Sequence, residues 1–141
     1  MFYLFSSFLL TAPLGVTVEL AEIHHQHVKK AEVSATELKS WYDQNKVMTV
    51  IDARSVKYYN GTVLPNAIWL PSESTEQDIS AKLPSKNDLI VVYCWGLKCP
   101  ASGWLFDKLI SMGYTNVHEY HEGLEDWLKH GYATQTLKIR N

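Results

Sequence analysis

Apolar residues in this chain fall into short runs separated by amphipathic segments, and this alternation predicts a sheet built from strand–helix units. The runs over residues 47–51, 67–70, 89–93 and 117–120 have the length and composition of strands. The run over 89–93 is apolar throughout, as is typical of a strand covered on both faces. Because helical segments separate the strands, we expect an α/β fold: a small, mainly parallel sheet of about four to five strands flanked by helices on both faces.

Capping signals mark where the helices begin. Residues 34–37 form a capping box with Ser as the N-cap, and residues 74–77 form a second candidate. Residues 101–112 carry a broad apolar stripe that ends at Gly113, a residue suited to a left-handed helix C-cap. A short helix is expected over residues 124–129. Ligands of parallel sheets bind at the carboxyl ends of the strands, so we expect functional residues in the loops that follow them.

Residues 1–32 lie outside the predicted core, which leaves a single domain over residues 33–141. Residues 2–18 carry no charged side chain and resemble the apolar centre of a signal peptide or a membrane tether. The alternative is a buried strand or a docked arm, because apolar and more polar positions alternate over residues 16–20. The length of the uncharged run favours export, either to the periplasm or to a membrane anchor, over a cytoplasmic location.

The composition is typical of one globular domain. The chain has 141 residues, of which 46% are hydrophobic and 20% charged, so it can bury one working core. A net charge of −2 without a cluster of Lys or Arg gives no electrostatic reason to bind nucleic acid. Two cysteines cannot form a scaffold of several disulfides. His24, His25 and His27 are weak evidence for a metal site, so we expect neither a metal nor a cofactor.

Cys94 is the strongest candidate for chemistry because it ends the buried run 89–93 and precedes a tight loop and a helix that opens at Pro100. Backbone N–H groups of such a loop and the positive end of the helix dipole favour a thiolate over a thiol, so we expect a lowered pKa. The alternative is an inert buried thiol. We expect an anion to bind beside this sulfur, in the loop formed by Trp95, Gly96, Leu97, Lys98 and Cys99.

Several short motifs occur in an order that resembles a single rhodanese-homology domain over residues 33 to 134. The Cys-Trp-Gly-Leu-Lys-Cys loop is most similar to a subgroup whose loops read Cys-x-Gly-x-x-Cys. The motifs are Ile51–Arg54, Gly61–Ile68, Val92–Cys94, Met112–Tyr114 and His121–Trp127.

The resemblance implies a sulfurtransferase of the rhodanese type. Cys94 would attack a sulfane-sulfur donor, such as thiosulfate or a persulfide, and hold the sulfur as a persulfide. Amide groups of the loop would stabilise that anion, and the sulfur would pass to a thiophilic acceptor. The partners expected are therefore a small sulfur-donor anion and a thiol or protein acceptor.

The loop departs from the family pattern at Cys99, where sulfurtransferases commonly have Arg. Lys98 compensates only in part, because a point charge does not replace a planar guanidinium. Phosphatases with this fold need a loop longer by one residue and an Arg that holds phosphate. Here Pro100 already opens the helix, which excludes phosphatase or arsenate chemistry.

Cys99 raises an alternative function. It could resolve an oxidised Cys94 into a Cys94–Cys99 disulfide, which would make the chain a redox-sensing or binding module without turnover. It could equally be a small core residue at the start of the helix. Three further residues are expected to support the site: Asp52 and Arg54, as a structural ion pair or as loop hydrogen bonds, and His121, in a loop near the site.

Overall fold

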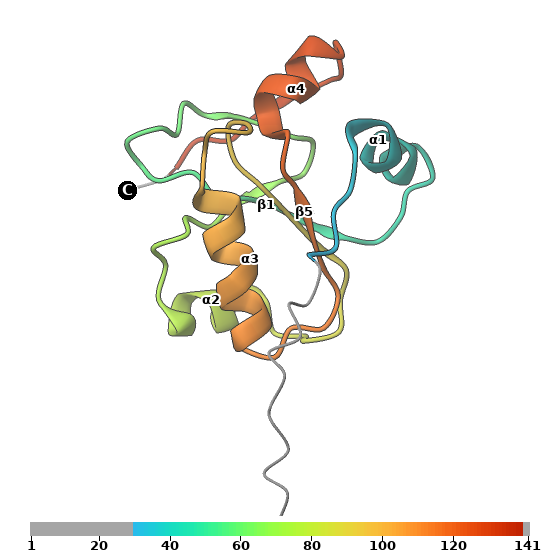
Figure 1. Cartoon of the computed structure of the whole chain (residues 1–141). Helices are drawn as coiled ribbons and strands as arrows, with labels where there is room; N and C mark the ends of the chain where they lie inside the picture. The colour runs from blue at the N-terminus through green and yellow to red at the C-terminus, as the bar shows by residue number, and fades with distance from the viewer. Residues whose placement is uncertain (1–29, 140–141) are drawn as a thin grey trace, which may run out of the picture.

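The computed structural model describes residues 30–139 and arranges them as a sheet between helical layers (Figure 1). The sheet has four parallel strands in the order β3-β1-β4-β5, which confirms the predicted α/β fold. A separate antiparallel pair joins β2 (Thr62–Val63) to β6 (Gln135–Thr136). The other elements are α1 (Ala35–Asp43), β1 (Thr49–Asp52), β3 (Ile68–Trp69), α2 (Glu76–Lys82), β4 (Ile90–Tyr93), α3 (Ala101–Ser111), β5 (Val117–Tyr120) and α4 (Gly123–Lys129).

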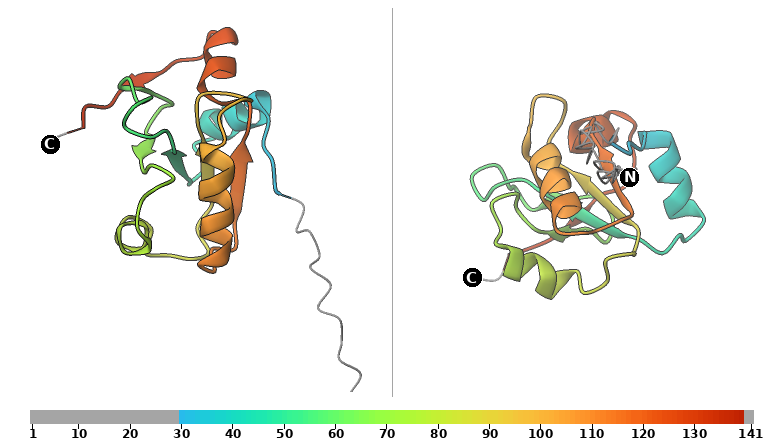
Figure 2. Two further views of the ribbon diagram at one scale, coloured as in Figure 1. Left: turned by 60° about the vertical axis from the view of Figure 1, so that its left-hand side comes forward. Right: turned by 60° about the horizontal axis from the view of Figure 1, so that its bottom comes forward.

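Two hydrophobic cores lie on opposite faces of the sheet, because successive strand residues point to opposite sides. Ile51 and Val92 face the core that α2 and α3 cover. Val50 and Val91 face the core that α1 and α4 cover. Figure 2 shows α1 and α3 on opposite sides of the strands. All residues of β4 are buried, as expected for an inner strand covered on both faces.

The helix caps agree with the sequence at α1 and differ by one residue at α2. The Ser34 Oγ atom accepts from the Glu37 N–H at 3.3 Å, as the capping box predicts. At α2 the cap is Thr75, which accepts from the Asp78 N–H at 3.1 Å, and the assignment to residues 74–77 was wrong by one position. The Ser74 N–H instead closes a turn onto Pro71. Two adjacent hydroxyl residues left the start of this helix ambiguous.

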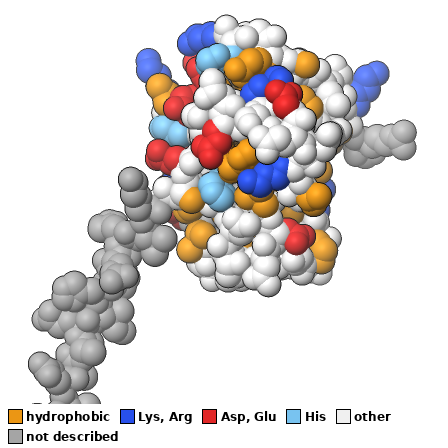
Figure 3. All heavy atoms as spheres, turned by 90° about the vertical axis from the view of Figure 1, so that its right-hand side faces the viewer, with side chains coloured by type: hydrophobic (Ala, Val, Ile, Leu, Met, Phe, Trp, Pro, Cys, Tyr) orange, Lys and Arg blue, Asp and Glu red, His pale blue; other side chains and the backbone are white. Residues whose placement is uncertain are grey.

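Residues before α1 extend the sheet at its β5 edge. The Glu119 N–H donates to the Ala31 carbonyl at 2.8 Å, and the Val33 N–H donates to the Glu119 carbonyl at 3.0 Å. This pairing places Lys30 and Glu32 beside β5, where they line a pocket described below. Viewed from the side of α1, the surface carries interspersed acidic, basic and histidine side chains (Figure 3).

The interpretations placed on residues 1–29 lie outside the described residues. They are the signal segment or membrane tether, the docked strand over residues 16–20, and the histidines at 24, 25 and 27. They stay predictions. Among the helices between residues 30 and 139, none combines the length and the apolar character that crossing a membrane requires.

Candidate active site

Cys94 directly follows β4, at the carboxyl end of an inner strand, where the sequence predicted the reactive thiol. Its side chain is fully buried, with 0% of its surface exposed. The Cys94 thiol donates to the Cys99 carbonyl oxygen over 3.1 Å, and its Sγ atom lies 3.4 Å from the Ser102 Oγ atom. The loop of residues 95–99 therefore folds back over the thiol and separates it from solvent.

The start of α4 holds this loop in place. The Leu124 N–H donates to the Cys94 carbonyl at 3.0 Å, and the Glu125 N–H donates to the Trp95 carbonyl at 2.8 Å. Gly123 permits this close approach: its φ is +66°, and a Cβ atom there would lie 2.5 Å from the Cys94 carbonyl oxygen. Glycine adopts a positive φ without strain and leaves room for the neighbouring backbone. Gly123 is therefore a structural requirement of the loop.

The polar groups around the Cys94 sulfur correct one expectation from the sequence. The Cys99 N–H closes a tight turn onto the Gly96 carbonyl at 2.9 Å, and the Cys99 carbonyl faces the thiol. Burial, with a smaller contribution from a hydrogen bond to the Cys99 side chain, raises the pKa of Cys94 to about 11. The expected lowering of this pKa was wrong, because the closed loop removes the thiol from water and turns an acceptor toward it. Burial therefore favours the neutral thiol of Cys94 over its thiolate.

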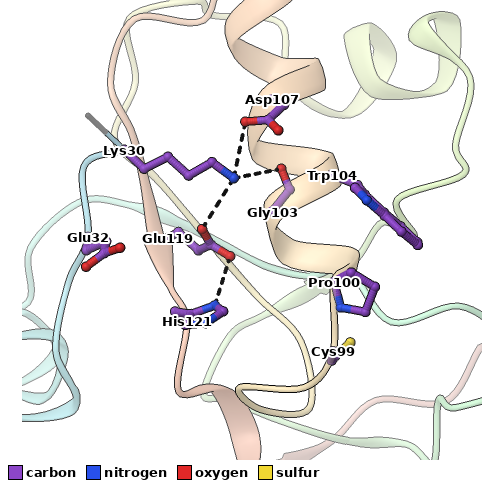
Figure 4. Close-up of a pocket in the computed structure, with 9 residues that line it drawn as sticks. All are labelled: Lys30, Glu32, Cys99, Pro100, Gly103, Trp104, Asp107, Glu119 and His121. Atoms are coloured by element: carbon purple, nitrogen blue, oxygen red, sulfur yellow. Dashed lines mark hydrogen bonds and ion pairs between the residues drawn. The ribbon is translucent and has the colours of Figure 1, made fainter. Parts of the chain in front are cut away.

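A pocket of about 430 Å³ lies between α3 and β5, beside the loop. Cys99 is partly exposed and lines this pocket, whereas Cys94 lies behind it without exposed surface. Figure 4 shows Cys99 and His121 toward one end and Lys30 with Asp107 toward the other. A molecule in the pocket can contact Cys99, whereas Cys94 exposes no surface to it. The remaining lining residues are Glu32, Pro100, Gly103, Trp104 and Glu119.

A buried carboxylate, Glu119 of β5, connects the pocket to Cys94. Glu119 is 4% exposed. Its Oε1 atom accepts a hydrogen bond of 2.7 Å from Ser102 Oγ and lies 3.4 Å from His121 Nδ1, while its Oε2 atom lies 3.8 Å from Lys30 Nζ (Figure 4). Sequence reasoning predicted His121 near the site and missed Ser102, Glu119 and Lys30. The one available signal was an acidic residue within a predicted strand.

Asp52 and Arg54 form the structural ion pair that the sequence predicted. The Arg54 Nε atom lies 3.0 Å from Asp52 Oδ1, the Nη2 atom lies 2.6 Å from Oδ2, and both side chains are fully buried. The Tyr93 hydroxyl donates to Asp52 at 3.2 Å, and Arg54 donates to the Thr62 carbonyl at 2.6 Å. These contacts join the ends of β1 and β4 to the segment that leads into β2.

Three loop residues, Trp95, Leu97 and Lys98, are exposed, and Gly96 is buried. Trp104, in the first turn of α3, is exposed as well and lines the pocket. Three large apolar side chains are thus exposed in the loop and the first turn of α3, and they are called the apolar rim below: Trp95, Leu97 and Trp104. An apolar rim at the edge of a pocket is typical of a surface that meets a partner larger than a small ion.

The family follows from a comparison with known protein families. A model described as the Rhodanese-like domain matches residues 34–130. The chain belongs to the rhodanese family. The match extends from the cap of α1 to the end of α4, and it confirms the resemblance carried by the short sequence motifs.

Relatives of this rhodanese-family chain include sulfurtransferases. It is 36% identical over 76 residues to thiosulfate sulfurtransferase PspE of Escherichia coli, which covers 54% of this chain and 70% of PspE. It is 34% identical over 105 residues to adenylyltransferase and sulfurtransferase UBA4 of Candida albicans, and the match covers 70% of this chain and 23% of UBA4. The crystal structure of the BH2092 protein from Bacillus halodurans has a TM-score of 0.68 at 26% identity, covering 76% of this chain and 77% of that one.

Proposed function

We propose that this chain is a sulfurtransferase in which Cys94 carries sulfane sulfur as a persulfide. The observation that supports the proposal most strongly is the position of Cys94, at the carboxyl end of an inner strand and in the loop before α3. Membership of the rhodanese family and the similarity to named sulfurtransferases point to the same chemistry.

Sulfur transfer takes place in two displacement steps at Cys94. In the first step, the Cys94 thiolate attacks the outer sulfur of the donor; a new S–S bond forms as the donor's own bond breaks, and sulfite or a thiolate leaves. In the second step, the acceptor thiolate attacks the outer sulfur of the Cys94 persulfide, and Cys94 leaves as a thiolate. The transferred sulfur atom has the same oxidation state in the donor, in the Cys94 persulfide and in the product persulfide. The cycle therefore consumes no external oxidant.

The first step requires the loop to open, because the thiol is buried and faces the Cys99 carbonyl. Cys99 lines the pocket and is partly exposed, and its carbonyl accepts from the Cys94 thiol, so opening of the loop moves this residue. After attack, the added sulfur occupies the space that this movement provides. Gating of this kind keeps the thiol away from water and oxidants until a donor is bound.

The charges around the pocket favour a persulfide donor over thiosulfate. Three carboxylates line the pocket, those of Glu32, Asp107 and Glu119, against one lysine, Lys30, and one histidine. Lys98 is the cation of the loop, and no arginine is present there. Like charges repel most strongly for a dianion, so thiosulfate binds less favourably than a persulfide, which carries a single charge.

The apolar rim favours an acceptor thiol carried on a protein over a small polar thiol. Trp95 and Leu97 of the loop and Trp104 of the first turn of α3 are exposed in the isolated chain. A small thiol would leave these side chains in water, whereas a protein surface would bury them and gain hydrophobic free energy.

A second function rests on the contact between the two cysteines. Both cysteines are free, and the Cys94 thiol donates a hydrogen bond to the Cys99 carbonyl oxygen. Two-electron oxidation by a peroxide would convert one thiol to a sulfenic acid, and the other thiol would displace water to give a Cys94–Cys99 disulfide. In that case the chain is a redox-sensing module, and the reduced and oxidised states differ in the shape of the loop.

Turnover with two donors separates these functions. We expect catalytic transfer of sulfur to a thiol acceptor in wild type, faster with a persulfide donor than with thiosulfate. Transfer is lost in Cys94→Ser and retained in Cys99→Ser, which serves as the matched control. Equal loss in both variants, together with a stable intramolecular disulfide in wild type, would support the redox module instead.

A further inference from the structure

We propose that Ser102, Glu119 and His121 form a proton pathway that takes the thiol proton of Cys94 to the pocket as the nucleophile is generated. The inference rests on the proposed use of Cys94 as a nucleophile and assigns the group that accepts its proton. In the closed loop the thiol exposes no surface, so the groups that can receive its proton before the loop opens are those within hydrogen-bond distance.

Ser102 has the only side-chain hydroxyl in contact with the Cys94 sulfur among the described residues, at 3.4 Å. A serine hydroxyl has a single proton. The short bond of 2.7 Å to Glu119 Oε1 uses that proton, so the Ser102 oxygen faces Cys94 as an acceptor. While the Ser102 proton stays in its bond to Glu119, Ser102 has no proton to donate to a Cys94 thiolate. Transfer of the Ser102 proton to Glu119 is therefore linked to formation of the Cys94 thiolate.

Protons move along this pathway from Cys94 toward His121. The Cys94 S–H donates to the Cys99 carbonyl in the closed loop, so it first turns toward Ser102 Oγ, 3.4 Å away. Its proton then passes to Ser102 Oγ while the Ser102 O–H proton passes to Glu119 Oε1. Glu119 then passes a proton to His121 Nδ1, in the imidazole tautomer that carries its hydrogen on Nε2. The products are a Cys94 thiolate, an intact Ser102 hydroxyl that now donates to it, a Glu119 carboxylate and a His121 imidazolium. Charge and protons balance, and no electron leaves the protein.

The surroundings of Glu119 suit a group that receives and releases a proton. Lys30 lies 3.8 Å from its Oε2 atom and 3.2 Å from Asp107, so the lysine is shared between two carboxylates. His121 lies 3.4 Å from Oε1 with 45% of its side chain exposed, which lets it exchange protons with solvent. The other titratable groups that face this cluster are Glu32 and Cys99, both of which line the same pocket.

Charge repulsion and proton transfer predict opposite results for Glu119→Gln. If Glu119 acts only as a nearby negative charge, its removal favours the Cys94 thiolate and speeds the reaction of Cys94. If Glu119 accepts the proton, its removal slows that reaction at neutral pH. Glu32→Gln removes the same charge from the same pocket, and Glu32 is not part of the proton pathway. It is therefore the matched control.

The test is the rate of Cys94 alkylation by iodoacetamide across pH 6 to 10, followed by mass spectrometry on the full chain carrying Cys99→Ser. Loop opening scales the rate at every pH, whereas the shape of the profile reports loss of the proton. We expect Glu119→Gln and Ser102→Ala to slow the reaction at pH 7 by at least about tenfold, and Glu32→Gln to leave it equal or faster. A Glu119→Gln variant that reacts as fast as its parent or faster would overturn the pathway.

His121 gives an independent test that does not depend on a buried substitution. We expect His121→Ala to slow alkylation at pH 7, and added imidazole to restore the rate by taking the place of the missing side chain. An unchanged rate, or a slow rate that imidazole does not restore, would overturn the role of His121. Alkylation requires no sulfur donor, so loss of sulfur transfer with an intact pathway would contradict the proposed function alone.

Discussion

Two buried carboxylates at the sheet, Asp52 and Glu119, have contrasting surroundings. Asp52 is enclosed, with the Arg54 guanidinium on both of its oxygens at 2.6 to 3.1 Å and a tyrosine hydroxyl at 3.2 Å. Glu119 has one short bond, to Ser102 at 2.7 Å, and longer contacts to His121 and Lys30 at 3.4 and 3.8 Å. The first cluster is closed on all sides, and the second opens onto a pocket.

The difference separates a carboxylate that stabilises the fold from one that takes part in chemistry. A closed, hydrogen-bonded pair of opposite charges is costly to break, because removal of one partner leaves the other charge buried without compensation. A carboxylate with one short bond, two longer contacts and a pocket beside it can be reached by partners outside the core. We expect substitutions at the closed cluster to act on stability, and substitutions at the open cluster to act on reactivity.

The largest effect is expected from Arg54→Met, which removes one partner of the closed pair. Asp52 then stays buried without its countercharge, at a cost of about 3 to 5 kcal/mol in the free energy of unfolding. Urea denaturation measures this loss. Replacing both residues by apolar ones of similar volume should recover part of it. A change below about 1 kcal/mol in the single variant would show that the two clusters do not differ in this way.

The next largest effect is expected from Gly123→Ala, which acts on the loop side and leaves the Asp52–Arg54 pair untouched. A Cβ atom there would lie 2.5 Å from the Cys94 carbonyl, and the backbone has a positive φ. We expect a loss of about 3 kcal/mol in the free energy of unfolding. Cys94 alkylation should become faster, because α4 no longer holds the loop closed. Gly113→Ala, also at positive φ but with open space around its Cβ position, is the matched control.

A smaller effect is expected from pH, through burial of Cys94. Burial raises the pKa of Cys94 from 9.0 to about 11 in the fold. The folded state binds the thiol proton of Cys94 more tightly than the unfolded chain does. The resulting contribution to the free energy of unfolding is fully present below pH 9 and is lost as the pH rises through 11. The loss is about 2 to 3 kcal/mol and should be absent in Cys94→Ser. Parallel pH curves for the two proteins would contradict it.

The smallest effect on stability is expected from Glu119→Gln. The glutamine oxygen still accepts from Ser102, so we expect a change of about 1 to 2 kcal/mol in the free energy of unfolding. The same variant should have the larger effect on the rate of Cys94 alkylation. A stability loss as large as that of Arg54→Met, with unchanged alkylation, would place Glu119 with the closed cluster.

Much of the fold could be predicted from the sequence because its signals are local. The apolar run before Cys94 and the capping box at Ser34 identify β4 and α1 without reference to the rest of the chain. The cap of α2 was misplaced because Ser74 and Thr75 both carry a hydroxyl that suits the position. In the structure the Ser74 N–H closes a local turn onto Pro71, and Thr75 caps the helix.

The candidate site could be predicted only in part, because its polar groups come from distant segments. Lys30, Ser102 and Glu119 meet where the segment before α1, helix α3 and strand β5 converge. In the sequence, His118 and Glu119 are equally plausible as exposed residues of a strand. The direction of the Cys94 pKa shift was missed for a similar reason, since it depends on how completely the loop covers the thiol.

The most direct test of the account is to find which cysteine carries sulfur after the reduced protein has reacted with a persulfide donor. The protein is digested without reductant, and the cysteine peptides are mapped by mass spectrometry. The account predicts one added sulfur atom on the peptide that contains Cys94, in wild type and in Cys99→Ser. Added sulfur on Cys99 alone, or a Cys94–Cys99 disulfide without added sulfur, would contradict it.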